Sequence, residues 1–139
     1  MKRAVIIGVM GGGSASEDEL QIAYDLGVRI AEAGWVLLNG GRDAGIMAAS
    51  AKGAAERGGV TVGILPDAQP SASAPHIQIA ICTGMGSARN TINVLSRDVV
   101  VACPGGTGTI SEIALALKHG KTVITMAFAT GELFDAYRK

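Results

Sequence analysis

The chain has 139 residues, the size of one ordinary domain, and hydrophobic residues make up 48% of it, which suffices for a single core. Its 12 basic and 12 acidic residues balance, so no overall field draws it to nucleic acid or to an anionic membrane. No run reaches the roughly 20 apolar residues of a membrane span, and the apolar run behind Met1 is too short for a signal peptide. We therefore expect one domain, residues 1–139, in the cytoplasm, with neither nucleic acid nor membrane as a partner.

Apolar runs rich in β-branched residues alternate with helical patterns along the chain. The expected strands are residues 4–9, 35–39, 60–65, 77–82, 98–103 and 122–126. The expected helices are residues 16–33, 46–57, a short one ending near 96, 110–119, and a last one in the tail 131–139. Strands that are apolar throughout are typically buried on both faces. The pattern predicts an α/β fold: a single-domain, Rossmann-like parallel sheet flanked by helices on both faces.

Helix ends and one loop are also marked in the sequence. Ser16 precedes three acidic residues and is expected to cap the first helix, which Gly34 ends. Asp43 is expected to cap the second helix. Residues 66–75, rich in Pro, Ser and Ala, are a low-complexity stretch that predicts a surface loop or a lid.

Glycine-rich turns follow four of the expected strands, and these turns should share one end of the sheet, where ligands bind in this kind of fold. The turn "PGGTGT", residues 104–109, suits a phosphate, because glycine allows close approach and its N–H groups join those of the next helix start. The candidate ligand-binding or phosphate-binding residues are Gly11, Gly12, Ser14, Gly40, Gly41, Arg42, Arg89, Asn90, Gly105, Gly106, Thr107, Gly108 and Thr109. The alternative is a plain strand-to-helix turn in which Thr109 and Glu112 form a capping box.

Two arginines stand in these turns. Arg89 begins a helix, where a cation opposes the helix dipole, and an anion shared with residues 104–109 would explain its placement. Its alternative is a surface arginine or a salt bridge. Arg42, in "GGRDAG", has a similar but weaker argument.

Other nucleotide and metal sites are disfavoured. The first turn, "GVMGGGSAS", does not have the G-x-G-x-x-G spacing, and Asn39 ends the second strand where a dinucleotide-binding enzyme has an acidic residue. No P-loop motif occurs. His76 and His119 are isolated, so no directly protein-bound metal is expected. Cys82 and Cys103 are interpreted as reduced, buried small residues, with a thiol lining a site as the alternative.

Two segments resemble a known family. "PGGTGTISE" matches the P-G-G-x-G-T-x-x-E motif of the LOG family, the cytokinin-activating phosphoribohydrolases, and "GGRDAGIM" resembles its G-G-x-x-x-G-[LI]-M segment. In these enzymes an arginine precedes the P-G-G motif by fifteen positions, as Arg89 precedes Pro104. The resemblance implies that Arg89 and Glu112 are the counterparts of a catalytic pair that cleaves the N-glycosidic bond of a nucleoside 5′-monophosphate.

The segment around Arg89 departs from the enzymes. Ser87 stands where they have His, and Asn90 where they have Lys. "ARNTINVLSRDVVVACPGGTGTISEIALALKHGK" is more similar to a sister branch of the same superfamily, which is related in fold to DNA-processing protein A. That branch includes the molybdenum cofactor carrier proteins of algae and cyanobacteria, which bind a pterin monophosphate.

The resemblance to the sister branch implies a non-catalytic carrier or store of the molybdenum cofactor, and a homo-oligomer, either a dimer or a tetramer. The alternative is a LOG-type phosphoribohydrolase that acts on a nucleoside 5′-monophosphate through Arg89 and Glu112. A third possibility is a nucleotide-sensing or purely structural member. A phosphorylated pterin or nucleotide as ligand is common to the first two.

Overall fold

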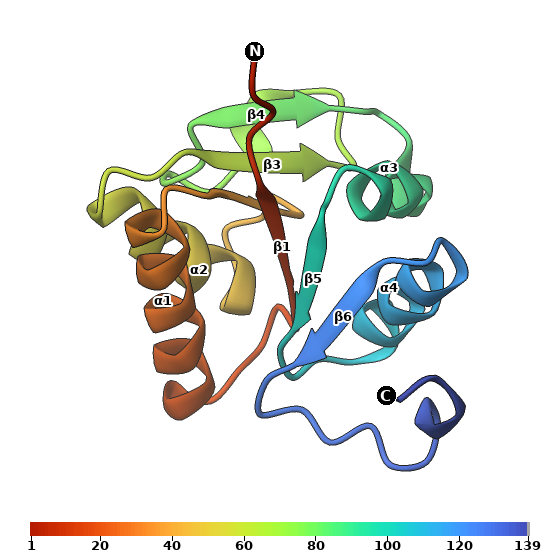
Figure 1. Ribbon diagram of the computed structural model, residues 1–139. Helices are drawn as coiled ribbons and strands as arrows, with labels where there is room; N and C mark the ends of the chain where they lie inside the picture. The colour runs from red at the N-terminus through yellow and green to blue at the C-terminus, as the bar shows by residue number, and fades with distance from the viewer. Residues whose placement is uncertain (139) are drawn as a thin grey trace.

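The sheet has six strands in the order β4–β3–β2–β1–β5–β6, with β1 near its centre (Figure 1). The computed structural model describes residues 1–138. Its strands are β1 (Ile6–Met10), β2 (Val36–Asn39), β3 (Thr61–Leu65), β4 (Ile79–Cys82), β5 (Val99–Ala102) and β6 (Thr122–Thr125). Its helices are α1 (Glu17–Glu32), α2 (Gly45–Glu56), α3 (Arg89–Leu95) and α4 (Thr107–Lys118), with short 3-10 turns η1 (Pro70–Ala72), η2 (Gly86–Ala88) and η3 (Asp135–Tyr137). Every strand pair is parallel, which confirms the predicted fold class.

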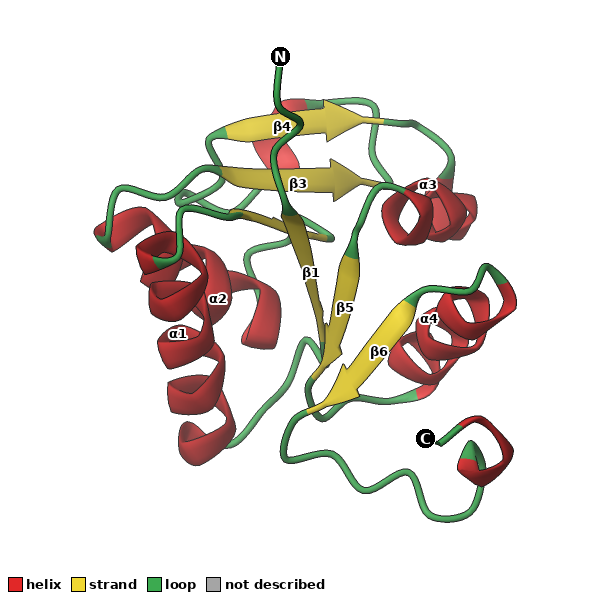
Figure 2. Cartoon of the chain, in the orientation of Figure 1, coloured by secondary structure: helices red, strands yellow, loops and turns green. Residues whose placement is uncertain are grey.

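Helices cover both faces of the sheet, α1 and α2 on one side and α3 and α4 on the other (Figure 2). Because successive strand residues point to opposite faces, β1 contributes to both layers of the core. Val9 packs in the layer under α1 and α2, and Met10 in the layer under α3 and α4. Gly8 points to the second layer, where a Cβ would lie 1.8 Å from Cδ of Arg97. The central strand therefore leaves room for a large side chain that crosses beneath it.

The first helix has the ends that the sequence predicts. The Ser16 hydroxyl accepts a hydrogen bond from the amide of Glu19, whose carboxylate accepts one from the amide of Ser16. Three acidic residues fill the first turn, where they complement the helix dipole. Gly34 follows the helix with a φ of 77°, a conformation that glycine adopts at low cost.

Three expectations about local structure are wrong. Asp43 does not cap α2, because the N-cap is Ala44 and makes no side-chain cap. Helix α4 begins at Thr107 rather than Ile110, so Thr109 lies inside its first turn and the expected capping box does not form.

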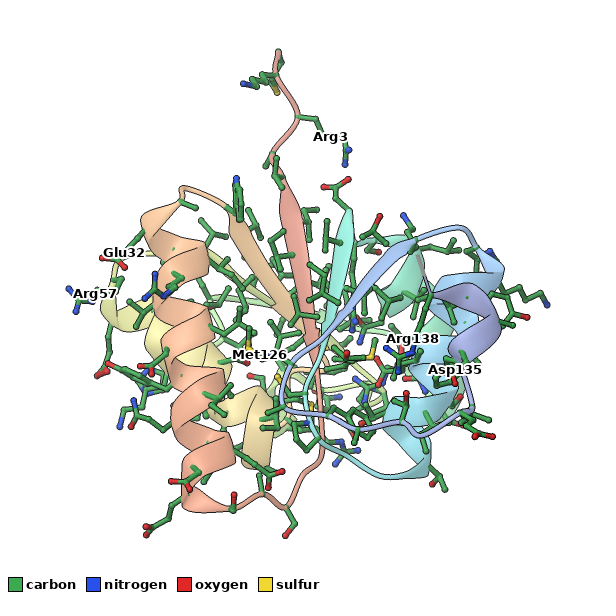
Figure 3. The ribbon with its side chains drawn as sticks, turned by 60° about the horizontal axis from the view of Figure 1, so that its bottom comes forward. Arg3, Glu32, Arg57, Met126, Asp135 and Arg138 are labelled. Atoms are coloured by element: carbon green, nitrogen blue, oxygen red, sulfur yellow. The ribbon has the colours of Figure 1, made fainter. Side chains whose placement is uncertain are left out.

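The tail also differs from the helix expected over residues 131–139. It holds a single 3-10 turn, Asp135–Tyr137, and residue 139 lies outside the described residues. Arg138 donates to the Asp135 carboxylate at 2.9 Å and to the Thr130 hydroxyl at 3.1 Å, and Figure 3 shows Arg138 beside Asp135. Within residues 1–138, no helix combines the length and the apolar content needed to cross a bilayer.

Helices α1 and α2 approach each other through two glycines. A Cβ at Gly27 would lie 2.1 Å from the carbonyl oxygen of Ser50, and one at Gly53 would lie 2.1 Å from that of Tyr24. Both obstacles are backbone atoms, which cannot rotate away. Glycine at these two positions therefore sets the distance between the helices.

Gly27→Ala is expected to lower the free energy of unfolding by about 1–3 kcal/mol, because the two helices must move apart. Helix propensity alone predicts the opposite sign, a gain of about 1 kcal/mol. Urea unfolding of both proteins measures the difference. Gly108→Ala is the control, since a Cβ there meets no atom within 4 Å. A Gly27→Ala variant as stable as the parent would show that the contact is loose.

Candidate functional site

A pocket of about 350 Å³ opens at the carboxyl ends of the central strands. The strand order reverses at β1, whose neighbours are β2 and β5, and such a reversal leaves a crevice in open parallel sheets. Three of the four expected glycine turns contribute lining residues, and the turn after β4 leads into α3, whose Arg89 and Asn90 line the pocket. The lining residues are Val9, Met10, Gly11, Gly12, Gly13, Gly40, Met47, Arg89, Asn90, Gly106, Thr107, Gly108, Thr109 and Glu112.

One wall of the pocket is the start of α4. The first intrahelical bond runs from the amide of Ile110 to the carbonyl of Gly106. No acceptor among residues 1–138 takes a hydrogen bond from the backbone N–H groups of residues 105–109. A Cβ at Gly106 or Gly108 would meet no protein atom within 4 Å. The helix start therefore presents donors and the positive end of a dipole to open space.

The turn after β1 is held tightly by its neighbours. The Gly12 amide donates to the Pro104 carbonyl at 2.8 Å, so this N–H is already used within the protein. A Cβ at Gly12 would lie 3.3 Å from the Cα of Gly105, and one at Gly11 would lie 2.6 Å from the Ile46 side chain. Glycine at position 12 lets this turn contact the turn after β5, and glycine at position 11 leaves room for the Ile46 side chain. The Gly12 amide is unavailable to a ligand.

Arg89 reaches the pocket from the start of α3 and is anchored at its guanidinium. Its Nη1 donates to the carbonyl of Gly40 at 2.8 Å and also to that of Ile64. The side chain thus ties the ends of β2 and β3 to α3. Burial lowers the pKa of Arg89, and the nearby Glu112 carboxylate opposes this effect. The interpretation as an exposed surface arginine is wrong.

Arg97, which lies behind the pocket and does not line it, is a residue that the sequence analysis missed. Its side chain is fully buried, and its Nη2 donates to the Glu112 carboxylate at 3.1 Å. Nε and Nη2 also donate to the Asn93 side-chain oxygen, one helical turn earlier. Burial lowers the pKa of Arg97 to about 10, so the group is protonated at neutral pH. Glu112 lies between this buried cation and the pocket.

Four of the expected ligand residues lie outside the lining: Ser14, Gly41, Arg42 and Gly105. The Gly41 amide is taken by the Asn39 side-chain oxygen at 2.7 Å. Arg42 lies 3.8 Å from the Asp67 carboxylate, with half of its side chain exposed. The segment 66–75, expected as a loop or lid, contributes no lining residue. Conversely, Val9, Met10, Gly13 and Met47 line the pocket without having been expected there.

The two cysteines differ, and neither lines this pocket. Cys82 is exposed, which corrects the expectation that both are buried. Cys103 is buried, and burial raises its pKa to about 11.

In the native protein at pH 8, Cys82 is expected to react with a thiol-specific reagent and Cys103 only after unfolding. The thiolate is the reactive form, and a pKa near 11 leaves about one thiol in a thousand ionised at that pH. Mass spectrometry of labelled peptides measures both sites, with Cys82→Ser as the control that labels no native site. Rapid labelling of Cys103 in the folded protein would contradict its burial.

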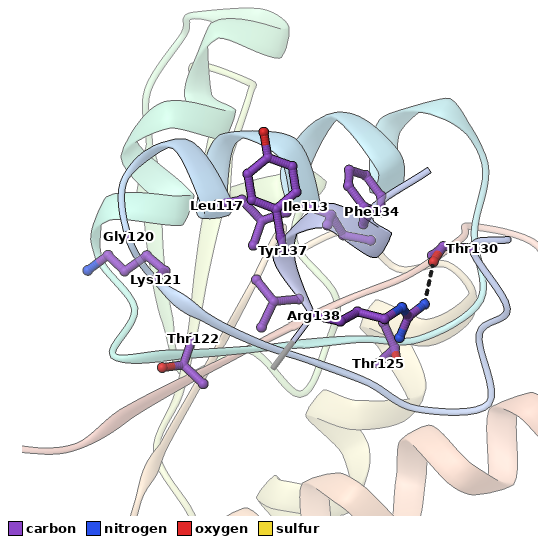
Figure 4. Close-up of a pocket in the computed structure, with 11 residues that line it drawn as sticks. Ile113, Leu117, Gly120, Lys121, Thr122, Thr125, Thr130, Phe134, Tyr137 and Arg138 are labelled. Carbon is purple, nitrogen blue, oxygen red and sulfur yellow. Dashed lines mark hydrogen bonds between the residues drawn. The ribbon is translucent and has the colours of Figure 1, made fainter. Parts of the chain in front are cut away.

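A second cavity, of about 590 Å³, lies between α4, β6 and the tail (Figure 4). Its wall is largely apolar, with Ile113 and Phe134 among its residues. The two cations on its wall are engaged: Lys121 donates to the carbonyls of Leu95 and Arg97, and Arg138 binds the tail. No cluster of three metal-ligating side chains occurs within residues 1–138.

Fold and pocket together define a Rossmann-like α/β protein with a ligand-sized cavity at the reversal of strand order. The model of the SLOG cluster4 family matches residues 4–139, and the chain belongs to this family.

Several other proteins are similar to most of the chain. The structure of the molybdenum cofactor binding protein from Rippkaea orientalis is 52% identical, with a TM-score of 0.87 over 90% of this chain and 77% of that one. The molybdenum cofactor carrier protein of Chlamydomonas reinhardtii is 47% identical, with a TM-score of 0.85 over 92% of this chain and 80% of that one. An uncharacterized protein of Archaeoglobus fulgidus is 50% identical over 120 residues, 86% of this chain and 78% of its own.

Proposed function

We propose that this protein binds a phosphorylated pterin, the molybdenum cofactor, and acts as its carrier or store. The observation that carries the proposal is the open start of α4 at the pocket, where the amides of residues 106–109 donate to no backbone acceptor within the described residues and these four residues line the cavity. Two of the solved structures similar to this chain are a molybdenum cofactor binding protein and a carrier protein of that cofactor. The pocket volume of about 350 Å³ lies within the range of small-molecule sites.

The pocket residues fit the two ends of such a ligand. The phosphate would lie at the amides of Gly106 to Thr109, with the Thr107 hydroxyl as a further donor. Met10 and Met47 give part of the wall an apolar, adaptable surface for a flat ring system. Arg89 and Asn90 lie on the wall contributed by α3 and would bind the oxygen-rich remainder of the ligand. A carrier needs only these contacts and exclusion of water, and no bond is broken.

A phosphoribohydrolase is the second candidate, and one observation favours it: Arg89 and Glu112, the counterparts of the LOG catalytic pair, line the same pocket. In that reading Glu112 assists the attack of water on the ribose carbon. One oxygen of the Glu112 carboxylate already accepts a hydrogen bond from Arg97. Only the other oxygen, which Arg97 does not contact, would be available for this step. A single carboxylate also does not match the two-carboxylate scheme of most glycosidases.

Native mass spectrometry of the protein incubated with the molybdenum cofactor, and separately with AMP, tests the proposal. We expect a retained cofactor and no release of adenine. Arg89→Met should weaken cofactor binding roughly tenfold or more, because it removes a charged hydrogen-bond donor. Arg29→Met, an exposed arginine on α1, is the matched control and should bind as the parent does. Adenine release without cofactor retention would identify an enzyme, and inertness toward both would leave a structural role.

A further inference from the structure

Asn39 is a fully buried polar side chain whose hydrogen bonds surround the turn after β2. Its Oδ1 accepts a hydrogen bond from the amide of Gly41 at 2.7 Å. Its Nδ2 donates to the carbonyl of Met47 at 3.0 Å and to the hydroxyl of Ser50 at 3.2 Å, both on α2. These partners determine the orientation of the side-chain amide, because a backbone N–H only donates and a carbonyl only accepts. Asn39 thus links the end of β2 to the turn and to α2.

The hydrogen bonds account for asparagine at a position where dinucleotide-binding enzymes have an acidic residue. Asn39 does not line the pocket, so it takes no part in the ribose contact that the acidic residue makes in those enzymes. A carboxylate accepts hydrogen bonds but donates none, so aspartate could not donate to the Met47 carbonyl. It would also bury a charge without a cationic partner. The task of residue 39 lies inside the protein.

Gly40 is the point at which this network meets the pocket. Its carbonyl accepts a hydrogen bond from Nη1 of Arg89 at 2.8 Å. A Cβ at Gly40 would lie 2.7 Å from that nitrogen and 2.8 Å from Sδ of Met47. Arg89 and Met47 line the pocket on either side of Gly40. The Asn39 side chain therefore fixes the turn at the residue that follows the anchor of Arg89.

Arg89 has two carbonyl acceptors, and they differ in what holds them. Ile64 lies within β3 and is in register with Ile81 of β4, so the sheet holds its carbonyl. Gly40 lies one residue beyond the end of β2 and outside the strand pairing. A glycine turn has wide conformational freedom unless further contacts restrict it. The hydrogen bond from Asn39 to the next amide is such a contact.

We infer that Asn39 is a positioning residue: it fixes the Gly40 carbonyl and so holds the Arg89 guanidinium at the wall of the pocket. A guanidinium that is already in place need not be ordered when an anion binds, and this lowers the free-energy cost of binding. The effect of Asn39 on affinity rests on the proposed function. The anchoring of Arg89 does not depend on any ligand.

Isothermal titration with the molybdenum cofactor measures the effect on affinity. Asn39→Ala should weaken binding about fivefold or more, because Arg89 loses its fixed place. Asn39→Ala combined with Arg89→Met should bind within about twofold of Arg89→Met alone, since two residues that act through one contact are not additive. Effects that multiply in the double variant would overturn the inference, because Asn39 would then act independently of Arg89.

Thr61→Val is the matched control. Thr61 is also 0% exposed, and its hydroxyl joins two backbone groups, the His76 carbonyl at 2.6 Å and the Gln78 amide at 2.8 Å. It begins β3, at the end of the sheet away from the pocket. This variant should lose stability and keep the affinity of the parent. An affinity loss equal to that of Asn39→Ala would show that binding follows overall stability, and would overturn the inference.

Side-chain NMR of the ligand-free protein tests the anchoring without the cofactor. In the unmodified protein, the Nη1 protons of Arg89 should exchange with water at least about tenfold more slowly than those of the exposed Arg29. The Arg89 signals are identified by their absence from Arg89→Met. Asn39→Ala should remove most of this protection, and Thr61→Val should keep it.

Two NMR results would overturn the inference. Protection of Arg89 that survives in Asn39→Ala would show that the turn holds without Asn39. Arg89 protons that exchange as fast as those of Arg29 in the unmodified protein would show that Gly40 does not hold the guanidinium, even if Asn39→Ala does not fold. If the parent retains no cofactor, the proposed function fails, and the exchange measurement still decides the role of Asn39.

Discussion

The Gly108→Asp variant is expected to lose at least about a hundredfold in affinity for the molybdenum cofactor, roughly 2.7 kcal/mol, without a loss of stability. The added carboxylate lies at the pocket wall, since Gly108 lines the pocket and a Cβ there meets no protein atom within 4 Å. There it occupies the place proposed for the phosphate and repels it, and like charges brought together at a binding site cost several kcal/mol. An acidic residue in the first turn of a helix is favourable, by about 0.3–1 kcal/mol, so the free energy of unfolding should not fall.

Two measurements on the same samples separate these effects. Isothermal titration with the cofactor measures affinity, and urea unfolding measures stability. Gly108→Ala serves as the control, because a methyl group adds volume without charge and should weaken binding much less than the carboxylate. If Gly108→Asp binds the cofactor as the parent does, the phosphate does not lie at the start of α4.

The Glu112→Gln variant is expected to be less stable than the parent by about 3–5 kcal/mol, whatever it does to binding. Its amide leaves Arg97 without a carboxylate, and the Arg97 side chain is 0% exposed and cannot reach water. Burial already lowers the pKa of Arg97 to about 10, which shows that its surroundings penalise the charge even with Glu112 present. Removing the partner deepens this penalty. Urea unfolding at neutral pH measures the loss.

A second substitution identifies the cause. Arg97→Met combined with Glu112→Gln removes both charges and keeps an unbranched apolar side chain beneath β1. The double variant should recover most of the lost stability, since replacing both partners of a buried ion pair is often neutral or stabilising. If the double variant is no more stable than Glu112→Gln alone, the unpaired arginine is not the reason. The double variant is also the better background for testing whether Glu112 takes part in base release.

The sheet could be predicted from the sequence because its strands are apolar runs separated by glycine turns. The expected and observed strands agree within two residues at each end; for example, residues 77–82 narrow to Ile79–Cys82 in the structure. The tail was mispredicted, because its composition permits a helix that its few contacts do not stabilise. Local pattern marks an element well where tertiary packing supports it.

The site was predicted in part, and the misses have physical reasons. The glycine turns that line the pocket carry a motif, so they can be recognised in the amino-acid sequence. Thr109 was expected to cap α4 because Thr109 and Glu112 have the spacing of a capping box. The N-cap is Gly106 instead, so α4 begins three residues earlier than expected. Arg97 could not be recognised, because an arginine next to Asp98 at the start of a strand is typical of the surface. Only the fold shows that Gly8, far away in sequence, opens the space it occupies.

Because Arg97 fills the space that Gly8 leaves, positions 8 and 97 depend on each other. Any side chain at position 8 would collide with Arg97, whose Cδ lies 1.8 Å from the expected Cβ. Homologous chains with a larger residue at position 8 should therefore lack a long side chain at position 97, and should have another arrangement for the acidic group at position 112. Substitutions at positions 8, 97 and 112 should therefore covary, and an alignment of the family can test this without any further structure.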